Sequence, residues 1–320
     1  MSTPSVSVVI PVYKAEKYID RCLESLARQT LDGVEYIFVN DASPDNSIDK
    51  VHSFFKATPL KNSTYRVVVN PGNRGVGFAR QNGLDHAQGK YVIHVDPDDW
   101  TEPGYLKKMY EQAEAAHADI VFCDIFIEYS DRTVESTQCP GTTDAREIID
   151  SLCHGRILGS CWNKLVRRDY IKDCNAIFIP GINVCEDVTF FLQLLRNNPR
   201  IAEVGQPLYH YDRFTNSNSI QRHLLPDHLD QDNRLIETVG AILSDSRFRS
   251  SADAFRSSAL FHIFEISPYS GTEFRRRYRH LWPAVAGNTK FSLPKKAILW
   301  LACHGLYRPA RAIYRTLKKA

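Results

Sequence analysis

The sequence predicts an α/β protein in which helices flank a mostly parallel β-sheet and a helical C-terminal region follows. Two observations carry this prediction. Over the first 130 residues, short β-branched runs alternate with helical patterns, and from Leu225 onward only helical patterns remain. The 320 residues are enough for one large α/β domain of roughly 200 to 250 residues plus an appendage.

Five short runs rich in β-branched residues are typical of strands that are buried on both faces. They are Val6–Pro11, Val34–Val39, Tyr65–Val69, Tyr91–Val95 and Asp119–Phe126. Helical patterns separate them, at Glu16–Leu31, from Pro44 with Ser43 as the N-cap, and at Val76–His86 before Gly89. Because strand–helix–strand repeats connect parallel strands, we expect a sheet whose ligands bind beyond the carboxyl ends of its strands.

The chain becomes less regular between Thr142 and Arg213. Here we expect a helix over Asp144–Cys153, a basic and aromatic stretch CWNKLVRRDYI, and a helix over Glu186–Asn197. These patterns predict a first domain over residues 1–220, with halves of about 1–130 and 131–220, followed by a helical region over residues 221–320.

The composition is that of an ordinary globular chain, with 43% hydrophobic and 24% charged residues, and it excludes collagen-like and disordered proteins. The eight cysteines contain no CxxC and no zinc-site spacing, so we expect reduced thiols. The N-terminus is predicted to form a strand rather than a signal peptide, and no run of 18 apolar residues predicts a membrane-spanning helix. We therefore expect a cytoplasmic protein.

The charge is unevenly distributed, although the formal net charge is only +3. Twelve of the 40 Lys and Arg and none of the 37 Asp and Glu follow Glu273, so residues 274–320 carry +12 and the first 273 residues carry −9. Near the C-terminus, apolar residues recur at helical spacing among basic ones: Leu299, Cys303, Leu306, Ala310, Ile313, Tyr314 and Leu317. We expect Pro309 to kink or interrupt this helix.

This basic amphipathic tail favours binding of residues 290–320 to an anionic membrane surface. The alternative is that the apolar stripe packs on the protein itself while the charges face water. The chain contains no recognisable DNA- or RNA-binding motif, so we do not expect a nucleic-acid partner.

Polar segments follow three predicted strands: PVYKAEKY at 11–18, NDASPDNS at 40–47 and DPDD at 96–99. Parallel strands bring these segments to the same edge of the sheet. Carboxylates gathered there repel one another unless a cation joins them. Mg²⁺ and Mn²⁺ are held by one or two protein carboxylates together with substrate phosphates. The sequence therefore predicts a divalent-metal site for a phosphate-bearing ligand, with a turn leading into a helix after Pro103 as the alternative for DPDD.

Several longer motifs occur in a characteristic order: VSVVIPVYKAEKYIDRCLESLARQTL, EYIFVNDASPDNS, NRGVGFARQNGL, GKYVIHVDPDDW and CEDVTFFLQLL. Together they cover about residues 4–213, and on them the chain resembles the family-2 glycosyltransferases, which have the GT-A (nucleotide-diphospho-sugar transferase) fold. The resemblance implies a GT-A-type, Rossmann-like sheet with its donor half at about 1–130 and its acceptor half at about 131–220.

The resemblance also implies roles on the donor side. Pro11, Tyr13 and Asp41 would line the nucleotide base and ribose, and Arg80 would lie near the donor diphosphate.

The D-x-D element of the family would be Asp96 and Asp98. The resemblance implies that Asp98 binds Mn²⁺ or Mg²⁺ directly and that Asp96 lies nearer the ribose, with Asp99 as an adjacent candidate.

Sugar transfer with inversion is an in-line displacement at the anomeric carbon. A nucleoside diphosphate leaves as a stable anion whose charge a metal can neutralise, so only one carboxylate base is needed to take the acceptor's proton. Asp187 occupies the position of that base in the family, with Glu186 beside it. The alternative is that both acids favour the positive end of a helix, and both interpretations can hold together.

Several further residues are weaker candidates. Trp162, Asn163 and Lys164 resemble a segment on the acceptor side of the cleft in relatives, and an amphipathic surface element anchored by Trp162 is the open alternative. We expect His94 to be a satisfied core histidine. His210 or Arg222 could close over the diphosphate, but a polar strand and loop is the default prediction.

Together these inferences predict a metal-dependent inverting glycosyltransferase. It would move a sugar from a nucleotide-diphospho-sugar, a UDP-sugar, to a glycan or lipid-linked glycan in bacterial-type surface polysaccharide synthesis, at the inner face of the plasma membrane. The alternative is a non-catalytic nucleotide- or glycan-binding protein on the same scaffold. The sequence leaves the sugar, the acceptor, the linkage and the oligomeric state open.

Overall fold

The structure, a computed structural model, describes residues 3–60, 62–214, 228–267 and 269–319. The chain divides into two compact units. Unit 1 comprises Met1–Ile148 and Ile157–Arg222, and unit 2 comprises Ile149–Arg156 and His223–Ala320. The domain boundary predicted near residue 220 lies in the range 215–227, outside the described residues.

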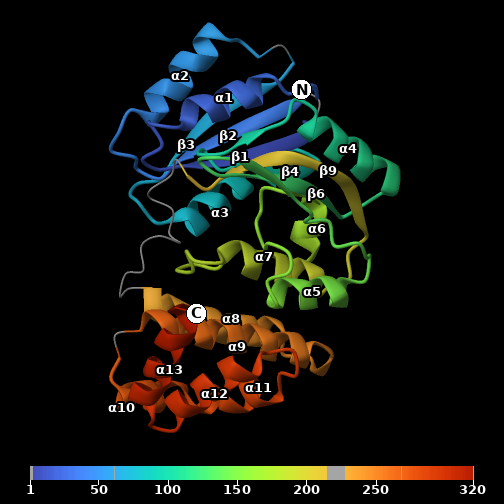
Figure 1. Cartoon of the computed structure of the whole chain (residues 1–320). Coiled ribbons are helices and arrows are strands. Elements are labelled where there is room, and N and C mark those ends of the chain that lie inside the picture. The colour runs from blue at the N-terminus through green and yellow to red at the C-terminus, as the bar shows by residue number, and fades with distance from the viewer. Residues whose placement is uncertain (1–2, 61, 215–227, 268, 320) are drawn as a thin grey trace. The chain divides into compact units, whose positions relative to one another are not determined.

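Unit 1 is built on one β-sheet, whose strands in the described residues are β1 (Val6–Val12), β2 (Val34–Asn40), β3 (Thr64–Val69), β4 (Tyr91–His94), β5 (Trp100–Thr101), β6 (Ile120–Glu128), β7 (Thr133–Ser136), β8 (Lys164–Arg167) and β9 (Ile201–Asp212). The strand order is β3-β2-β1-β4-β8-β6-β9-β5, with β7 paired to β6 (Figure 1). β1 to β4 are parallel, and β8 is antiparallel to both β4 and β6, so β6 and β9 run in the same direction as β1. The mostly parallel sheet is therefore confirmed.

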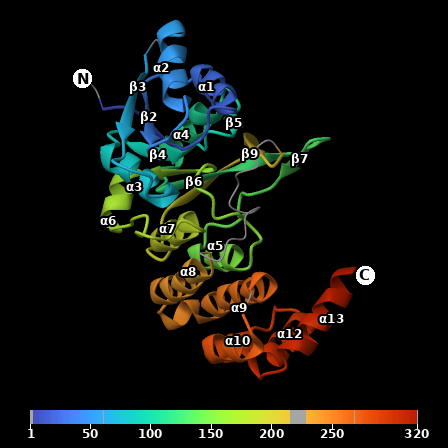
Figure 2. The same ribbon diagram turned by 90° about the vertical axis from the view of Figure 1, so that its left-hand side faces the viewer.

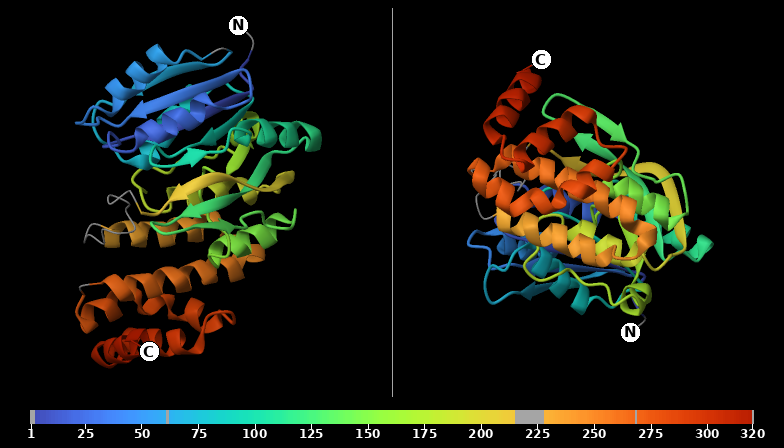
Figure 3. Two further views of the ribbon diagram at one scale, coloured as in Figure 1. Left: turned by 45° about the horizontal axis from the view of Figure 1, so that its top comes forward. Right: turned by 90° about the horizontal axis from the view of Figure 1, so that it is seen from below.

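Helices cover both faces of this sheet: α1 (Ile19–Ala27), α2 (Ser47–Ala57), α3 (Val76–His86), α4 (Tyr105–Ala116), α6 (Arg168–Asp173) and α7 (Glu186–Leu195). A further helix, α5 (Ala145–Cys153), has residues in both units. α1, α2 and α4 lie on one face, and α3, α6 and α7 on the other (Figures 1 and 3). Val8 and Ile10 of β1 point into the core beneath α1. Val9, on the opposite face, meets α3 at Gly83, where an added Cβ would lie 2.3 Å from Val9 Cγ1. The glycine lets the helix approach the sheet closely.

Two predicted helix starts are wrong by three residues. The helix predicted from Glu16 begins at Ile19, and the helix predicted from Pro44 begins at Ser47. Ser43 is not the N-cap, because its Oγ accepts a 2.8 Å hydrogen bond from the Lys14 backbone N–H. Ser43 thus bonds to the loop after β1, and the helix begins four residues later, at Ser47.

Unit 2 is helical throughout its described residues from 228 onward, as the sequence predicts. Its helices are α8 (His228–Ile242), α9 (Arg249–Ile266), α10 (Gly271–Tyr278), α11 (Trp282–Gly287), α12 (Leu293–Cys303) and α13 (Tyr307–Lys319), with short 3₁₀ turns η2 (Ser246–Phe248) and η3 (Arg279–Leu281). α8 and α9 lie side by side (Figure 2). A separate apolar core, which includes Leu260, Phe264, Phe274 and Leu299, holds the unit together. None of the described helices has the length and apolar character that crossing a membrane requires.

The C-terminal stripe divides between two environments. Leu299, Cys303 and Ala310 are buried in the core of unit 2, so packing on the protein itself is confirmed for part of the stripe. Leu306, Ile313 and Leu317 are 46%, 44% and 52% exposed.

The predicted interruption of the tail at Pro309 is wrong. The break falls at Gly305, whose φ of +97° favours glycine. Pro309 lies in the first turn of α13, where the missing N–H costs no hydrogen bond.

Candidate active site

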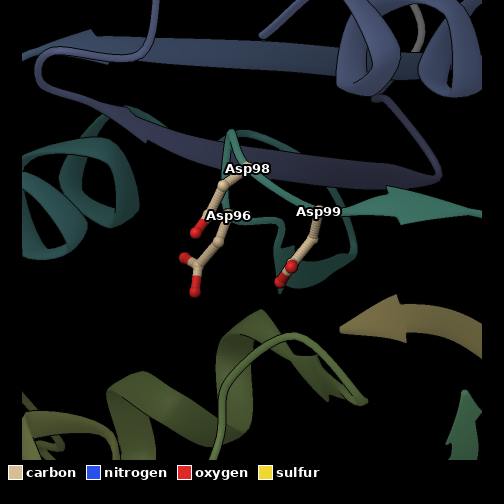
Figure 4. Close-up of side chains that lie close together, drawn as sticks. All are labelled: Asp96, Asp98 and Asp99. Carbon is tan, nitrogen blue, oxygen red and sulfur yellow. The ribbon is translucent and has the colours of Figure 1, made fainter. Parts of the chain in front are cut away.

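Three carboxylates gather directly after β4. Asp96, Asp98 and Asp99 each offer an oxygen, and these oxygens lie within 4.8 Å of one another. The three side chains extend to the same side of the loop (Figure 4). Hard oxygen donors at this spacing fit Mg²⁺ or Mn²⁺, which both prefer carboxylate ligands. The predicted gathering of acids at a strand end is therefore observed.

Asp99 is the buried member of this cluster and is held by β9. Its Oδ2 accepts a 2.7 Å hydrogen bond from the Tyr209 hydroxyl, and its Oδ1 accepts a 2.8 Å bond from the Asp212 backbone N–H. The Tyr209 oxygen also accepts a 3.1 Å bond from the Asp96 backbone N–H. Burial, with Asp98 and Asp96 nearby, raises the pKa of Asp99 well above its usual value. Asp99 thus ties the loop to the sheet, while Asp96 and Asp98 are only half-buried.

Arg21 of α1 supports the same loop from the other side. It donates a 3.1 Å hydrogen bond to the Asp98 carbonyl and pairs with Asp212. Its guanidinium lies 3.5 Å from the centre of the Trp100 ring, which adds a cation–π attraction. Sequence reasoning missed Arg21, Tyr209 and Asp212. No local motif marks them, because α1, β5 and β9 meet only in the folded chain.

Arg80 connects the acidic loop to α7. It is buried on α3, donates a 2.8 Å hydrogen bond to Asp96 Oδ1, and pairs with Glu186. Burial alone would lower the pKa of Arg80, but Asp96 and Glu186 raise it above its usual value, so Arg80 stays charged. Burial raises the pKa of Glu186, and Arg80 opposes part of that rise. The predicted contact of Arg80 with a diphosphate stays a prediction, because two protein carboxylates hold its guanidinium here.

Asp187 differs from its neighbour in accessibility. Both acids lie in the first turn of α7, which follows Cys185 in a left-handed conformation with φ of +55°. Glu186 is buried, whereas Asp187 is half-buried and its Oδ1 accepts a 2.8 Å bond from the Val188 backbone N–H. Asp187 is also close enough to Arg80 to raise the pKa of that guanidinium. The helix-start interpretation is confirmed, and the role of Asp187 as a base stays a prediction.

Asp41 closes the end of β2. Its carboxylate accepts hydrogen bonds from Asn70 Nδ2 at 2.7 Å, from the Arg74 backbone N–H at 3.1 Å and from the Gly75 backbone N–H at 2.9 Å. Gly75 has φ of +89°, which lets the glycine-rich segment before α3 wrap around the acid. Asp41 therefore shapes this corner of the sheet. Of the two other residues predicted to contact the nucleotide, Pro11 is buried in β1 and Tyr13 is exposed just beyond it.

Trp162 and Lys164 are interior residues, so the surface-element alternative for this segment is wrong. The Trp162 ring stacks on Tyr209 with centres 4.5 Å apart. Lys164 is 1% exposed, and its Nζ donates to the Leu158 and Ser160 carbonyls at 2.8 Å each and to Asn163 Oδ1 at 2.7 Å. Burial lowers the pKa of Lys164 to about 8.

Three weaker candidates remain: His94, His210 and Arg222. His94 is in the core as predicted but is not satisfied, since its Nδ1 finds no hydrogen-bond partner among the described residues, and burial lowers its pKa. His210 lies within β9, bonded to Glu128 at 2.7 Å and Glu102 at 2.9 Å, so the polar strand is confirmed. Arg222 lies outside the described residues.

Comparison with known proteins agrees with this arrangement. The model of the family "Glycosyl transferase family 2" matches residues 7–175. The putative glycosyltransferase EpsH of Bacillus subtilis is 34% identical over 229 residues, which are 70% of this chain and 64% of that protein. The uncharacterized glycosyltransferase EpsJ of the same organism is 32% identical over 223 residues, 67% of this chain and 62% of EpsJ. The match thus spans less than two thirds of the length of these relatives.

Solved structures show the same fold. Residues 1–349 of S. aureus TarS, in complex with UDP-GlcNAc, align with a TM-score of 0.76 and 20% identity over 98% of this chain and 92% of that chain. The mannosyltransferase PcManGT from Pyrobaculum calidifontis, in complex with GDP-Man and Mn²⁺, aligns with a TM-score of 0.58 and 16% identity over 98% and 83%. From the matched family, the related sequences and the shared architecture, we conclude that the chain belongs to glycosyl transferase family 2 and has the GT-A fold.

Proposed function

We propose that this chain is a metal-dependent inverting glycosyltransferase that uses a UDP-sugar. The observation that supports it most is the connection between the acidic loop and α7. Asp96 and Asp98 lie at the carboxyl end of β4, and Arg80 joins Asp96 to the helix turn that carries Asp187. A candidate metal site and a candidate base therefore belong to one continuous group of side chains in unit 1.

The proposed donor is a UDP-sugar because TarS, which shares the fold, is described in complexes with UDP-GlcNAc and with UDP. Pro11, Tyr13 and Asp41 would surround the base and ribose, since they lie at or just beyond the carboxyl ends of β1 and β2, where α/β sheets bind ligands. Asp41 would act partly through the backbone of residues 74 and 75, which it holds.

The proposed metal is Mn²⁺ or Mg²⁺, held by Asp98 directly, with Asp96 nearer the ribose. When bound, it would neutralise charge on the departing diphosphate. Asp99 would fix the loop through Tyr209, because both of its oxygens already accept hydrogen bonds from β9. Arg80 would keep Asp96 oriented and would lie near the donor diphosphate.

The proposed base is Asp187, which would take the proton of the acceptor hydroxyl as that oxygen attacks the anomeric carbon. Its place in the first turn of α7 fixes the direction of the carboxylate. Glu186 would hold that turn through Arg80. Trp162 and Lys164 would support the acceptor side by ordering residues 158–163, to which Lys164 Nζ donates three hydrogen bonds.

The proposed acceptor is a glycan or lipid-linked glycan of a bacterial-type surface polysaccharide. One relative, 28% identical over 209 residues, is a minor teichoic acid biosynthesis protein, GgaB of Bacillus subtilis. We further propose that the chain works on the cytoplasmic side of the membrane and binds an anionic surface through residues 290–320, whose exposed apolar side chains include Leu306, Ile313 and Leu317.

Calorimetric titration with UDP in the presence and absence of Mn²⁺ tests the proposal. We expect metal-dependent binding that Asp98→Ala abolishes and that the control Asp131→Ala, an exposed acid that pairs with its neighbour Arg132, retains. Equal binding with and without metal, or full binding by Asp98→Ala, would refute the metal-dependent mechanism. Metal-dependent binding without any sugar transfer or donor hydrolysis across a panel of nucleotide sugars would favour the non-catalytic alternative.

A further inference from the structure

A hollow in unit 2 concentrates positive charge. It has a volume of about 650 Å³ and is lined by Thr272, Arg275, Arg276, Arg279, His280 and Pro283, and we call it the arginine hollow. Arg277 of α10, which also carries Arg275 and Arg276, pairs with Glu273 at 3.2 Å. The three arginines of the hollow form no ion pair with any side chain in the described part of the chain, and no acidic residue follows Glu273 in the sequence.

The arrangement suits a phosphate. Arg275 and Arg279 are one turn apart, and like charges at this spacing disfavour an isolated helix. An anion between them would offset that repulsion. Guanidinium groups present a planar fork of donors that matches phosphate oxygens in two-pronged hydrogen bonds, and the neighbouring Thr272 hydroxyl adds a further donor. The charged groups at the hollow are therefore of the kind that binds a phosphate or phosphodiester group.

Exposed apolar side chains flank the turn that Arg275 approaches. Arg275 packs against the turn between α12 and α13, since a Cβ added to Gly305 would lie 3.5 Å from Arg275 Nη1. Leu306 follows that turn and Trp300 precedes it by one helical turn, and they are 46% and 44% exposed. A phosphate site beside exposed tryptophan and leucine is typical of surfaces that bind at a lipid–water interface. A soluble phosphate ligand would give these apolar groups nothing to contact.

We propose that the arginine hollow binds the phosphate of an anionic phospholipid headgroup while Trp300 and Leu306 enter the lipid interface. This inference rests on the proposed membrane association and gives it a specific site. The sequence pattern placed membrane binding in residues 290–320, whereas the hollow is formed by residues 272–283 of α10, η3 and α11.

Vesicle flotation with the full chain tests the inference. The probes are vesicles of phosphatidylglycerol mixed with phosphatidylcholine and vesicles of phosphatidylcholine alone. We expect binding to the first kind only, and a loss of about 100-fold in partitioning for the triple variant Arg275→Gln, Arg276→Gln, Arg279→Gln. The control Arg28→Gln, Lys56→Gln, Arg249→Gln removes the same charge from exposed positions outside the hollow and should bind nearly as well as the natural chain.

Further outcomes separate the inference from the proposals on which it rests. If the hollow variant and the charge control float equally well while Leu306→Ser with Ile313→Ser does not, the hollow is refuted and tail-mediated membrane binding stands. If the natural chain does not float at all, both are refuted, and UDP binding measured on the same sample still reports on the transferase proposal. If inorganic phosphate at low millimolar concentration displaces the chain fully from the vesicles, the lipid assignment is overturned in favour of a soluble phosphate ligand. Unchanged circular dichroism of each variant confirms that it is folded.

Discussion

The loop after β4 and the α7 side of the candidate active site differ in the burial and in the partners of their charged side chains. In the loop after β4, Asp96 and Asp98 are half-buried acids close to each other and to Asp99. On the other side, Glu186 in the first turn of α7 and Lys164 of β8 are buried and bonded to protein atoms. In the loop, Arg80 pairs with Asp96 and the carboxylates of Asp96 and Asp98 stay partly accessible to a ligand, whereas on the α7 side the charged groups are bonded to protein atoms. Substitutions in the first region should therefore change binding and turnover, and substitutions in the second should change stability.

The sharpest test of this contrast lies within α7 itself, at two adjacent acids. Asp187→Asn should lower the rate of sugar transfer about 10³-fold, because a general base contributes about 10² to 10⁴, while UDP affinity stays unchanged. Glu186→Gln should chiefly lower the free energy of unfolding, because it weakens the pair with Arg80. Steady-state kinetics and urea unfolding of both variants measure whether each substitution lowers activity or stability. Retained turnover in Asp187→Asn would remove this residue from the mechanism.

The next largest effect is expected at Arg80. Arg80→Met leaves Glu186 buried without its cation and should lower the free energy of unfolding by about 3 to 5 kcal/mol. Arg66→Met is the matched control, since its partner Glu35 is also buried but keeps bonds from Ser7 and from the Gly89 backbone N–H. Chemical denaturation should show a clearly smaller loss for the control. Equal losses in the free energy of unfolding would mean that the ion pair between Arg80 and Glu186 stabilises the chain no more than the one between Arg66 and Glu35.

The buried Lys164 should make the free energy of unfolding depend on pH. Its pKa is about 8 in the folded chain against 10.5 for an ordinary lysine, so between these values the unfolded chain binds a proton that the folded chain does not. Stability should therefore rise with pH in this window. Relative to Lys164→Met, the natural chain should gain about 1.4 kcal/mol per pH unit.

Urea unfolding at several pH values from 7.5 to 10 measures this gain for Lys164. Lys172→Met, at an exposed position of α6, controls for the loss of a lysine side chain elsewhere in unit 1. A constant difference between the natural chain and Lys164→Met would show that Lys164 titrates normally.

The smallest expected effect concerns the support of the acidic loop. Tyr209→Phe removes the hydroxyl that bonds Asp99 and the Asp96 backbone, but keeps the ring that stacks on Trp162. Partners that orient metal ligands are typically worth 10- to 100-fold in metal affinity, so we expect Mn²⁺-dependent UDP binding to weaken about 10-fold. Titration of this variant beside Tyr211→Phe separates loss of the hydroxyl bond from a general effect of altering β9. Equal affinities for the two variants would contradict a supporting role for Tyr209.

Much of unit 1 could be predicted because its signals are local. The β-branched runs marked β1 to β4 and β6, and DPDD marked the acidic loop, since parallel strands bring their carboxyl ends together. β5 and β8 were not predicted, because they are short and pair with strands that are distant in the sequence. The short β7 was also not predicted, although it forms a local hairpin with β6. The helix starts at Ile19 and Ser47 were displaced because Ser43 bonds the loop after β1 instead of capping a helix.

The site was predictable to the same degree and for the same reason. A motif can identify Asp96, Asp98 and Asp187, whose chemistry depends on residue type and short spacing. It cannot show that Arg80 bonds Asp96 and Glu186, which is 106 positions away, or that Tyr209 holds Asp99 across 110 positions. These partners lie on helices and strands whose contact depends on how the sheet is ordered.

The sequence by itself determined the alternation of strands and helices, the acids at the strand ends and the excess of positive charge after Glu273, because each follows from local composition and periodicity. Only the tertiary structure decided which of those charges are compensated. Burial fixed Lys164 and Glu186 among protein partners, while α10 and η3 left three arginines around one hollow. The free energy of a charge depends on its surroundings, and those surroundings are made by residues far apart in the chain.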